Sequence, residues 1–428
     1  MAGSNNRRSR ARMVPQLNEP CIYSIFSHVP AAKILSSVKI LSKIWKNDTQ
    51  ETVFIEEQLC QAKPGLLIQD NEYPFSRIRH FSIDKGVFKM TDHFASGEDQ
   101  IQRLQVPQMP TVRTMRVLAS CDGVSLVFFN GFDYQGFLVK GLFVANIVKK
   151  RMRRIQLPDQ AYLHREYCSI GRVPQTREIK VMCPYTFRKR GLRWCVATVG
   201  ADQSWREIGL TMDVTDRPRN HRSVNIVSCS GVIYLDQASG SQHTTFAVDL
   251  SDESVHRVNV PEYNPPDPGQ YEILGAAAFP PLDDKFLVLS DSDEYSLPLD
   301  GRLVVMRDKV TFIAPHQHLG NDSSTLNLYT LADFRSSRWE ACDKRIHPDI
   351  VRMYISENAV PVAWLDGEDV LVCRVRKVKQ KDHNLGYWYS YCLVAYNVRT
   401  GSRRRVPGVE VCRKHRVTGH TNSLVWYH

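Results

Sequence analysis

The most constraining feature of this 428-residue chain is a strand pattern that recurs about every 50 residues. Each copy has an apolar strand ending in a small polar residue, then a polar turn and a short second strand. The clearest copies are Leu142–Asn146 with Arg154–Pro158, and Thr245–Asp249 with Arg257–Pro261. Units of this length, each able to hold two hairpins, are typical of propeller blades, which close radially and leave only short edges.

The spacing of the copies predicts how many blades the domain holds. Asn146, Thr198 and Asp249 lie 52 and 51 positions apart, and Asn397 follows 148 positions after Asp249, close to three more units. Residues 66–428 therefore predict an all-β domain of six or seven blades. The chain has no Gly-Gly pair, so the propeller is kelch-like in size without being a strict kelch repeat.

Two further copies end in tryptophan, at Trp205 and Trp339. Each tryptophan follows a polar turn and precedes a charged residue, so we expect both to be packed structural residues between blades. Two strands, Leu66–Gln69 and His80–Asp84, precede the first clear copy. Because propellers often close by pairing strands from both chain ends, Ser423–Tyr427 is a candidate closing strand.

Before the repeats, residues 17–60 show helical periodicity in three apolar stripes. The first helix has Pro20 where a first-turn proline is tolerated, and Pro30 ends it. A second helix is predicted from Ile34 to Trp45, and a third over Thr52–Gln61 with Phe54, Ile55 and Leu59 turned inward. Such a small three-helix unit buries little surface, so it needs a partner or a neighbouring domain.

These patterns divide the chain into three parts. Residues 1–14 form a basic tail with four arginines and no acidic residue, which is typical of a disordered, solvated segment; a nuclear-import or polyanion-binding patch is the alternative. Residues 15–61 form the small all-α unit, and residues 62–428 form the propeller.

Composition limits the compartment and the partners. The net charge of +11 permits a polyanionic partner without requiring one. The 11 cysteines include no CxxC pair, and no signal segment is visible, which indicates a reducing compartment such as the cytoplasm or the nucleus. No apolar run approaches the ~20 residues that a membrane span needs.

Catalytic motifs are absent from the sequence. It has no GxSxG, HExxH, GxGxxG or phosphate-loop pattern. His316 and His318 have no nearby third ligand, and the cluster Asp291–Glu294 lacks calcium-loop spacing, so both are expected to be polar loops. We therefore expect a protein that is not an enzyme and has no metal and no cofactor.

Four basic runs lie in or beside the predicted hairpin turns. They are expected to be solvated loops or to recognise an acidic protein. Aromatic residues lie near only some of them, for example Trp388 and Tyr389, which disfavours nucleic-acid binding. The runs are residues 149–154, 188–190, 374–381 and 403–405.

The helical segment resembles an F-box. Leu17–Pro30 is similar to its opening pattern, L-P-x-D-x-x-x-x-I-L-S-x-L-P, and Leu41–Trp45 is similar to its closing V-S-K-x-W. Asn18 and Pro20 depart from the usual proline and acidic residue. The later chain resembles the F-box-associated domains of plant F-box proteins, with landmarks in the same order. These are Cys121–Asn130, Leu142–Pro158, Ser204–Arg206, Cys229–Tyr234 and Phe246–Leu250.

The resemblance implies a substrate-recognition adaptor of an SCF-type E3 ubiquitin ligase. The helical unit would bind a Skp-type linker, which connects it to cullin, and the propeller would bind a client protein for ubiquitination. The alternative is a propeller binding module with a degenerate F-box, binding an anionic polymer or an acidic protein. By resemblance, the residues that form or support the linker-binding surface are Leu17, Ile25, Phe26, Val29, Pro30, Leu35 and Trp45.

Overall fold

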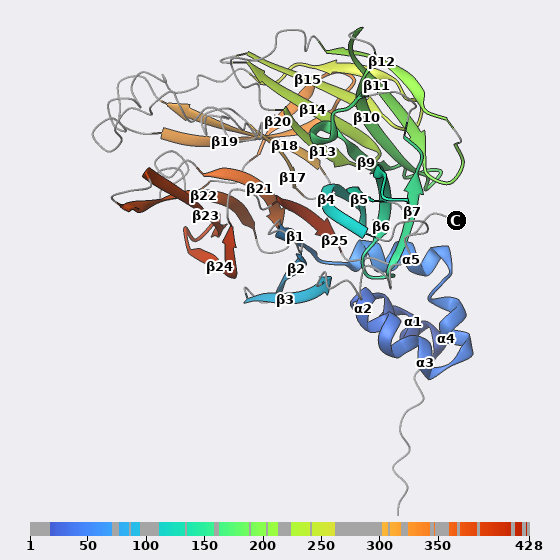
Figure 1. Cartoon of the computed structure of the whole chain (residues 1–428). Helices are drawn as coiled ribbons and strands as arrows, with labels where there is room; N and C mark the ends of the chain where they lie inside the picture. The colour runs from blue at the N-terminus through green and yellow to red at the C-terminus, as the bar shows by residue number, and fades with distance from the viewer. Residues whose placement is uncertain are drawn as a thin grey trace, which may run out of the picture.

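A computed structural model of the chain has a helical unit followed by a β-propeller (Figure 1). The structure describes residues 18–70, 77–84, 87–94, 111–132, 135–157, 162–187, 190–202, 204–212, 224–239, 242–261, 302–306, 309–317, 324–342, 346, 359–365, 369–382, 386–411, 416–421 and 425. The basic tail, Leu17, His318, the cluster Asp291–Glu294 and part of the basic run 188–190 lie outside these residues.

The first helix, α1, spans Glu19–Ser27 and has Pro20 in its first turn, as predicted. The Asn18 side chain accepts a hydrogen bond from the N–H of Cys21 at 3.1 Å. Asn18 therefore serves as the N-cap of α1, a role for which asparagine is among the best residues. The helix ends at Ser27, and Pro30 follows as the N-cap of the next helix.

The second predicted helix is divided in two. Ala31–Lys33 (α2), a π-helical turn at Ile34–Val38 (η1) and Lys39–Leu41 (α3) form one continuous stretch. Ser42 is extended, and its hydroxyl accepts the N–H of Ile44 at 3.1 Å.

The prediction of one helix from Ile34 to Trp45 is therefore wrong. A serine N-cap holds its backbone outside the helical region and starts a new helix. This new helix, α4, covers Lys43–Asp48, and α5 covers Thr52–Gln61 as predicted.

The propeller strands begin at Pro64. Their bounds are β1 (Pro64–Asp70), β2 (Arg77–Asp84), β3 (Val87–Phe94), β4 (Thr111–Cys121), β5 (Val124–Phe132), β6 (Leu138–Asn146), β7 (Arg151–Ile155), β8 (Tyr162–Leu163), β9 (Ser169–Arg172), β10 (Ile179–Phe187), β11 (Arg190–Thr198), β12 (Arg206–Met212), β13 (Val224–Cys229), β14 (Val232–Ser239), β15 (Gln242–Asp249), β16 (Val255–Val258), β17 (Arg302–Met306), β18 (Lys309–Gln317), β19 (Ser324–Asp333), β20 (Arg338–Ala341), β21 (Val360–Leu365), β22 (Val370–Asp382), β23 (Gly386–Asn397), β24 (Arg403–Val411) and β25 (Arg416–Thr421). A 3₁₀ turn, η2, spans Arg165–Tyr167.

The described strands form six antiparallel sheets, which are the blades of a six-bladed propeller. Blade 1 is β25-β1-β2-β3, blade 2 is β4 to β7, and blade 3 holds β8 to β12. Blades 4, 5 and 6 are β13 to β16, β17 to β20 and β21 to β24. The inner strands β25, β4, β9, β13, β17 and β21 contact one another in this order around a closed ring.

The ring closes in blade 1 by pairing the two ends of the propeller. β25 lies antiparallel to β1, with Gly65 opposite His420 and Leu67 opposite Thr418. Closure by strands from both ends is confirmed, but the closing strand is Arg416–Thr421 rather than the predicted Ser423–Tyr427. Of that predicted segment the structure describes only Val425, which is buried and whose carbonyl accepts a hydrogen bond from Asn146.

The recurring polar residues Asn146, Thr198, Asp249 and Asn397 prove to be the ends of equivalent strands. Each ends the third strand of its blade, counted outward from the inner strand that borders the ring. Only two blades, not three, occupy the 148 positions after Asp249, because 43 positions separate Val258 at the end of β16 from Arg302 at the start of β17. This separation explains why the spacing also allowed seven blades.

Two tryptophans tie neighbouring blades together. The indole N–H of Trp205, just before β12, donates to the carbonyl of Gln156 at 2.6 Å, beyond the last strand of blade 2. The indole N–H of Trp339 in β20 donates to the carbonyl of Asn259 at 2.7 Å, beyond the last strand of blade 4. Both rings are half-buried against the core, so their predicted packing between blades is confirmed.

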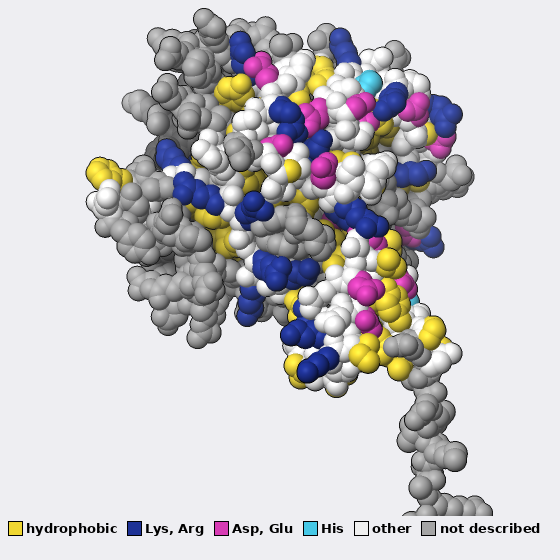
Figure 2. Space-filling model, turned by 90° about the vertical axis from the view of Figure 1, so that its right-hand side faces the viewer, with side chains coloured by type: hydrophobic (Ala, Val, Ile, Leu, Met, Phe, Trp, Pro, Cys, Tyr) yellow, Lys and Arg dark blue, Asp and Glu magenta, His cyan; other side chains and the backbone are white. Residues whose placement is uncertain are grey.

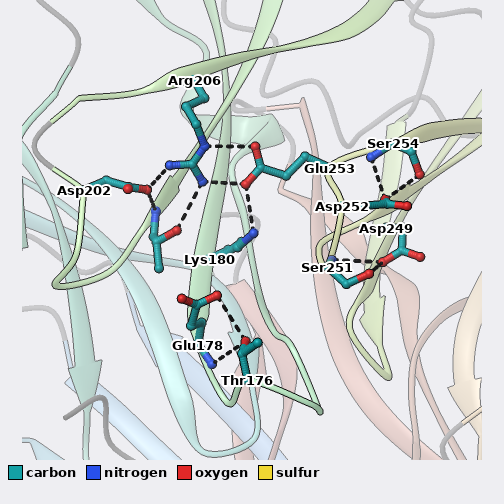
Figure 3. Close-up of polar contacts among 11 residues, drawn as sticks. Thr176, Glu178, Lys180, Asp202, Arg206, Asp249, Ser251, Asp252, Glu253 and Ser254 are labelled. Atoms are coloured by element: carbon teal, nitrogen blue, oxygen red, sulfur yellow. Dashed lines mark hydrogen bonds and ion pairs between the residues drawn. The ribbon is translucent and has the colours of Figure 1, made fainter.

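Charged side chains join blades 3 and 4 (Figure 3). Glu253, in the turn between β15 and β16, accepts hydrogen bonds from Lys180 Nζ at 2.8 Å and from Arg206 Nε at 3.0 Å. The hydrogen bonds from Arg206 lower the pKa of Glu253, against the effect of its burial, and Lys180 adds to the lowering. Lys180, whose side chain is 7% exposed, thus has a direct counter-charge.

Candidate docking surface of the helical unit

The helical unit shares a hydrophobic core with blades 2 and 3. Ala31, Ile34, Val38, Phe54 and Ile55 are buried in one cluster with residues of the two blades. The blade residues include Val144, Val148, Ile170 and Val181. The unit therefore rests on the propeller through buried apolar surface, as its small size predicts.

An ion pair fixes the same contact. Glu56 on α5 receives both terminal nitrogens of Arg172 on β9, one of them at 3.1 Å to Oε2. Arg172 is 8% exposed and also lies 3.7 Å from Asp122. Burial alone lowers the pKa of Arg172, but the hydrogen bond and charge of Glu56 more than offset this, so the pKa is raised. A buried, bidentate pair of this kind sets the orientation of α5 on the propeller.

Aromatic pairs hold the helices of the unit to one another. Phe26 and Trp45 meet edge to face with 5.0 Å between ring centroids, and Tyr23 and Phe54 do so at 5.1 Å. The hydroxyl of buried Ser27 hydrogen-bonds Glu57 at 3.1 Å. Edge-to-face pairs contribute beyond the area that they bury, so Phe26 and Trp45 are support residues inside the unit.

The outer surface of the unit is unusually apolar. In the described part of the chain, six large hydrophobic side chains are exposed, and five of them belong to the helical unit. They are Ile25 (50% exposed), Ile40 (80%), Leu41 (69%), Ile44 (59%) and Val53 (67%). Figure 2 shows hydrophobic side chains at the surface of this unit. This concentration of exposed apolar side chains makes the unit a candidate interaction site.

The structure separates the predicted linker-binding residues into two groups. Ile25 and Pro30 lie at the surface, where a partner can reach them. The side chains of the second group are half-buried and pack against the core that the unit shares with the propeller. This group is Phe26, Val29, Leu35 and Trp45.

Ile40, Leu41, Ile44 and Val53 are exposed apolar residues that were not among the predicted site residues. A partial signal for three of them exists in the sequence, since a single helix through positions 40, 41 and 44 would place them close together. In the structure Ser42 separates them, so that Ile40 and Leu41 belong to α3 and Ile44 to α4. An apolar stripe that is wider than the core requires indicates a second, outward contact.

Among the residues described, no three His, Cys, Asp or Glu side chains gather in a way that could hold a metal ion. None of the described helices is long and apolar enough to cross a membrane.

Comparison with known proteins assigns no family. No protein-family model matches the chain, and no curated protein sequence does either. Among solved structures, the chain is similar to the β-propeller domain of the Trilobed protease from Pyrococcus furiosus, at 12% identity and a TM-score of 0.33, with 69% of this chain and 84% of that one covered.

Two other solved structures are similar at the same level. A prolyl endopeptidase matches at 7% identity and a TM-score of 0.36, covering 88% of this chain and 55% of that one. An acylaminoacyl peptidase from Pyrococcus horikoshii matches at 10% identity and a TM-score of 0.31, covering 69% and 45%. Similarity at this level carries no argument about function.

Proposed function

We propose that this protein is a non-catalytic, substrate-recognition adaptor of an SCF-type E3 ubiquitin ligase. In this proposal the helical unit binds a Skp-type linker, and through it cullin, while the propeller binds the client protein. The observation that carries the proposal is the concentration of exposed apolar side chains on the helical unit. The F-box-like pattern of Leu17–Pro30 and Leu41–Trp45 supplies the class of partner.

The energetics of burial favour a protein partner for this surface. Burying a Val, Leu or Ile side chain completely contributes roughly 1.5–3 kcal/mol, so several such anchors offset the cost of association. The exposed residues come from α1, α3, α4 and α5, so one partner would have to contact several helices at once.

The attachment of the helical unit fits the work of an adaptor. A client held by the propeller has to keep a constant position relative to the ligase. The shared core and the Glu56–Arg172 pair limit movement between the two parts. A helical unit connected only by a flexible linker would not give this constancy.

A second candidate function rests on charge. The turn before β7 and β7 itself hold Lys149, Lys150, Arg151, Arg153 and Arg154 with no acidic residue among them. This favours a binding module for an anionic polymer or an acidic protein, whose helical unit no longer binds a linker. Under this alternative, binding of a polyanion would persist when the apolar helical surface is changed.

The test measures binding of the full-length chain to a purified Skp-type linker by biolayer interferometry. We expect Ile40→Asp with Ile44→Asp to weaken binding by roughly 2–4 kcal/mol, because central apolar anchors dominate an interface. The matched control is Phe137→Asp, since Phe137 is the sixth exposed hydrophobic residue and lies on the propeller, just before β6.

Two results would contradict the adaptor proposal. One is that the unmutated protein does not bind the linker at micromolar concentration. The other is that the Phe137 variant loses as much affinity as the helical variant. Thermal melting of each variant ensures that lost binding is not lost folding. Affinity purification with and without residues 15–60, followed by mass spectrometry, would then identify the client.

A further inference from the structure

Two basic segments, far apart in sequence, meet where the helical unit touches blade 2. Residues 31–47 contain four lysines and residues 147–157 contain five lysines or arginines, and neither segment contains an acidic residue. Val38 from the first segment and Val148 from the second are buried in the same core cluster. Figure 2 shows Lys and Arg side chains gathered on the helical unit and beside it on the propeller. We call Lys39, Lys149 and Arg151 the basic seam.

The cations of the seam influence one another. Burial, then the charges of Arg151 and Lys39, lower the pKa of half-buried Lys149 to about 8. Burial, then the charges of Arg151 and Lys46, lower the pKa of half-buried Lys39. In the part of the chain that the structure describes, no acidic side chain pairs with any of the three seam residues.

The seam differs from two places where this protein buries a cation beside a carboxylate. Lys180 has Glu253 at 2.8 Å, and Arg172 has both Glu56 and Asp122. Taking a charge out of water without a counter-charge is unfavourable, so such groups are normally paired inside the protein. At the seam the described residues supply no such counter-charge.

The backbone of the seam is held in place before any ligand arrives. The Asn146 side chain accepts the N–H of Lys149 at 2.7 Å and donates to the carbonyl of Val425 at 2.8 Å. Asn146 itself is fully buried. A fixed turn reduces the ordering cost of binding, which is the usual benefit of preorganisation.

We propose that Lys39, Lys149 and Arg151 form a binding site for a small, multiply charged oxyanion of the phosphate class. A guanidinium binds phosphate oxygens in a bidentate manner, and lysines supply point charges beside it. The two lysines are half-buried, so a compact anion reaches them more readily than a carboxylate fixed on a folded partner. Trp45 is the only aromatic residue in the two segments and packs on Phe26, which disfavours base stacking.

This proposal is independent of the adaptor function. It names a ligand that would join the helical unit to blade 2, since Lys39 belongs to α3 and Lys149 and Arg151 to the turn and start of β7. Loss of linker binding would leave the proposal untouched, and absence of an anion site would leave the adaptor proposal untouched.

The experiment titrates inorganic tripolyphosphate into the full-length protein by isothermal titration calorimetry at pH 7 and fixed ionic strength. We expect one site per chain, weakened about tenfold or more in Lys39→Gln with Lys149→Gln, as the loss of charge-assisted hydrogen bonds implies. Lys140→Gln, an exposed lysine on β6 of the same blade, is the matched control and should bind like the unmutated protein.

Comparison ligands decide whether the site prefers this anion class. A hexaglutamate peptide and a single-stranded oligonucleotide are titrated under the same conditions, and weaker binding of both than of tripolyphosphate supports the proposal. Tighter binding of either overturns it in favour of an acidic protein or a nucleic acid. Absent binding of tripolyphosphate at millimolar concentration overturns it, as does equal affinity in the double variant. The substitutions remove unpaired charges, so melting should show that these variants are folded.

Discussion

The helical unit and the propeller bury their hydrophobic residues in opposite ways. The propeller closes on itself, because β25 pairs with β1, and its large apolar side chains pack within and between the blades. The helical unit packs on blades 2 and 3, whereas its Ile40, Leu41 and Ile44 stay exposed and take no part in the shared core. A closed ring of blades pairs the strands at its two ends, whereas a small helical bundle leaves apolar surface exposed for a partner.

The largest effect that can test this contrast comes from shortening the chain. Removing residues 1–62 deletes the helical unit, whereas removing residues 1–110 also deletes β1 to β3 and leaves β25 without its partner. We expect the first shortened chain to unfold cooperatively at a lowered temperature, since it keeps the ring but loses one side of a shared core. The second should lose its cooperative transition and aggregate, because an unpaired strand edge is exposed.

Differential scanning calorimetry distinguishes the two shortened chains. Equal unfolding enthalpies and equally sharp transitions would show that the first three strands contribute nothing to ring stability. That outcome would contradict the role of blade 1 in closing the ring. It would also contradict the contrast between the self-closed propeller and the helical unit.

A second test acts on the contact between the two parts. Glu56→Ala should lower the free energy of unfolding by about 3 kcal/mol, because it leaves Arg172 buried without its main counter-charge. Adding Arg172→Met should recover part of the loss, since the uncompensated charge is then gone. Chemical denaturation of these two variants and of Arg172→Met alone gives the free energies of unfolding for a complete double-mutant cycle. If the double variant is less stable than Glu56→Ala, the pair is not the reason for the loss.

A third test concerns the packing between blades. Trp339→Ala should cost about 2–3 kcal/mol, toward the lower end for large-to-small changes because the ring is only half-buried. Trp339→Phe keeps an aromatic ring next to Phe312 but removes the hydrogen bond to Asn259, so its cost should be about 1 kcal/mol. Urea denaturation measures both. Unchanged stability in both variants would show that this contact between blades contributes nothing to folding.

The smallest expected effect is a gain in stability at the seam. Burial, Arg151 and Lys39 lower the pKa of Lys149 to about 8, whereas an unfolded lysine titrates at about 10.4. Between these pH values the unfolded chain binds more protons, so this group makes stability rise with pH, and its full penalty applies below pH 8. Lys149→Met should therefore stabilise the protein by about 1 kcal/mol at pH 7, after allowance for solvent screening.

The gain from Lys149→Met should shrink as the pH rises from 8 to 10.4, because the neutral lysine of the parent protein no longer carries the penalty. Denaturation at several pH values tests this trend. The matched substitution Lys140→Met should change stability little and show no such trend. A gain for Lys149→Met that stays constant across this pH window would mean that removed charge is not its cause.

Local signals in the sequence were sufficient for much of the fold. Pro20 and Pro30 bounded the first helix, and the stripe of Phe54, Ile55 and Leu59 identified α5 with its observed limits. The marks at Asn146, Thr198 and Asp249 repeat because each ends the third strand of a blade. These features depend on neighbours a few residues away, so they can be read without knowing the tertiary structure.

Only the tertiary structure decided three other features. The blade count was ambiguous, because 43 positions lie between β16 and β17, nearly the length of a blade, whereas β13 and β17 are direct neighbours in the ring. The sequence could not divide the apolar stripe into the residues that pack inward, such as Trp45, and those that stay outside, such as Ile44. The division depends on how the unit lies on blades 2 and 3.

The candidate sites show the same division. By itself the sequence determined that this chain is a repeating β-propeller preceded by a small, apolar helical unit, since periodicity and turn residues act locally. Folding decided that Lys39 lies near Lys149, more than a hundred positions away, and that no acidic side chain among the described residues pairs with them. Charge pairing across such a distance depends on packing in three dimensions, which no local pattern records.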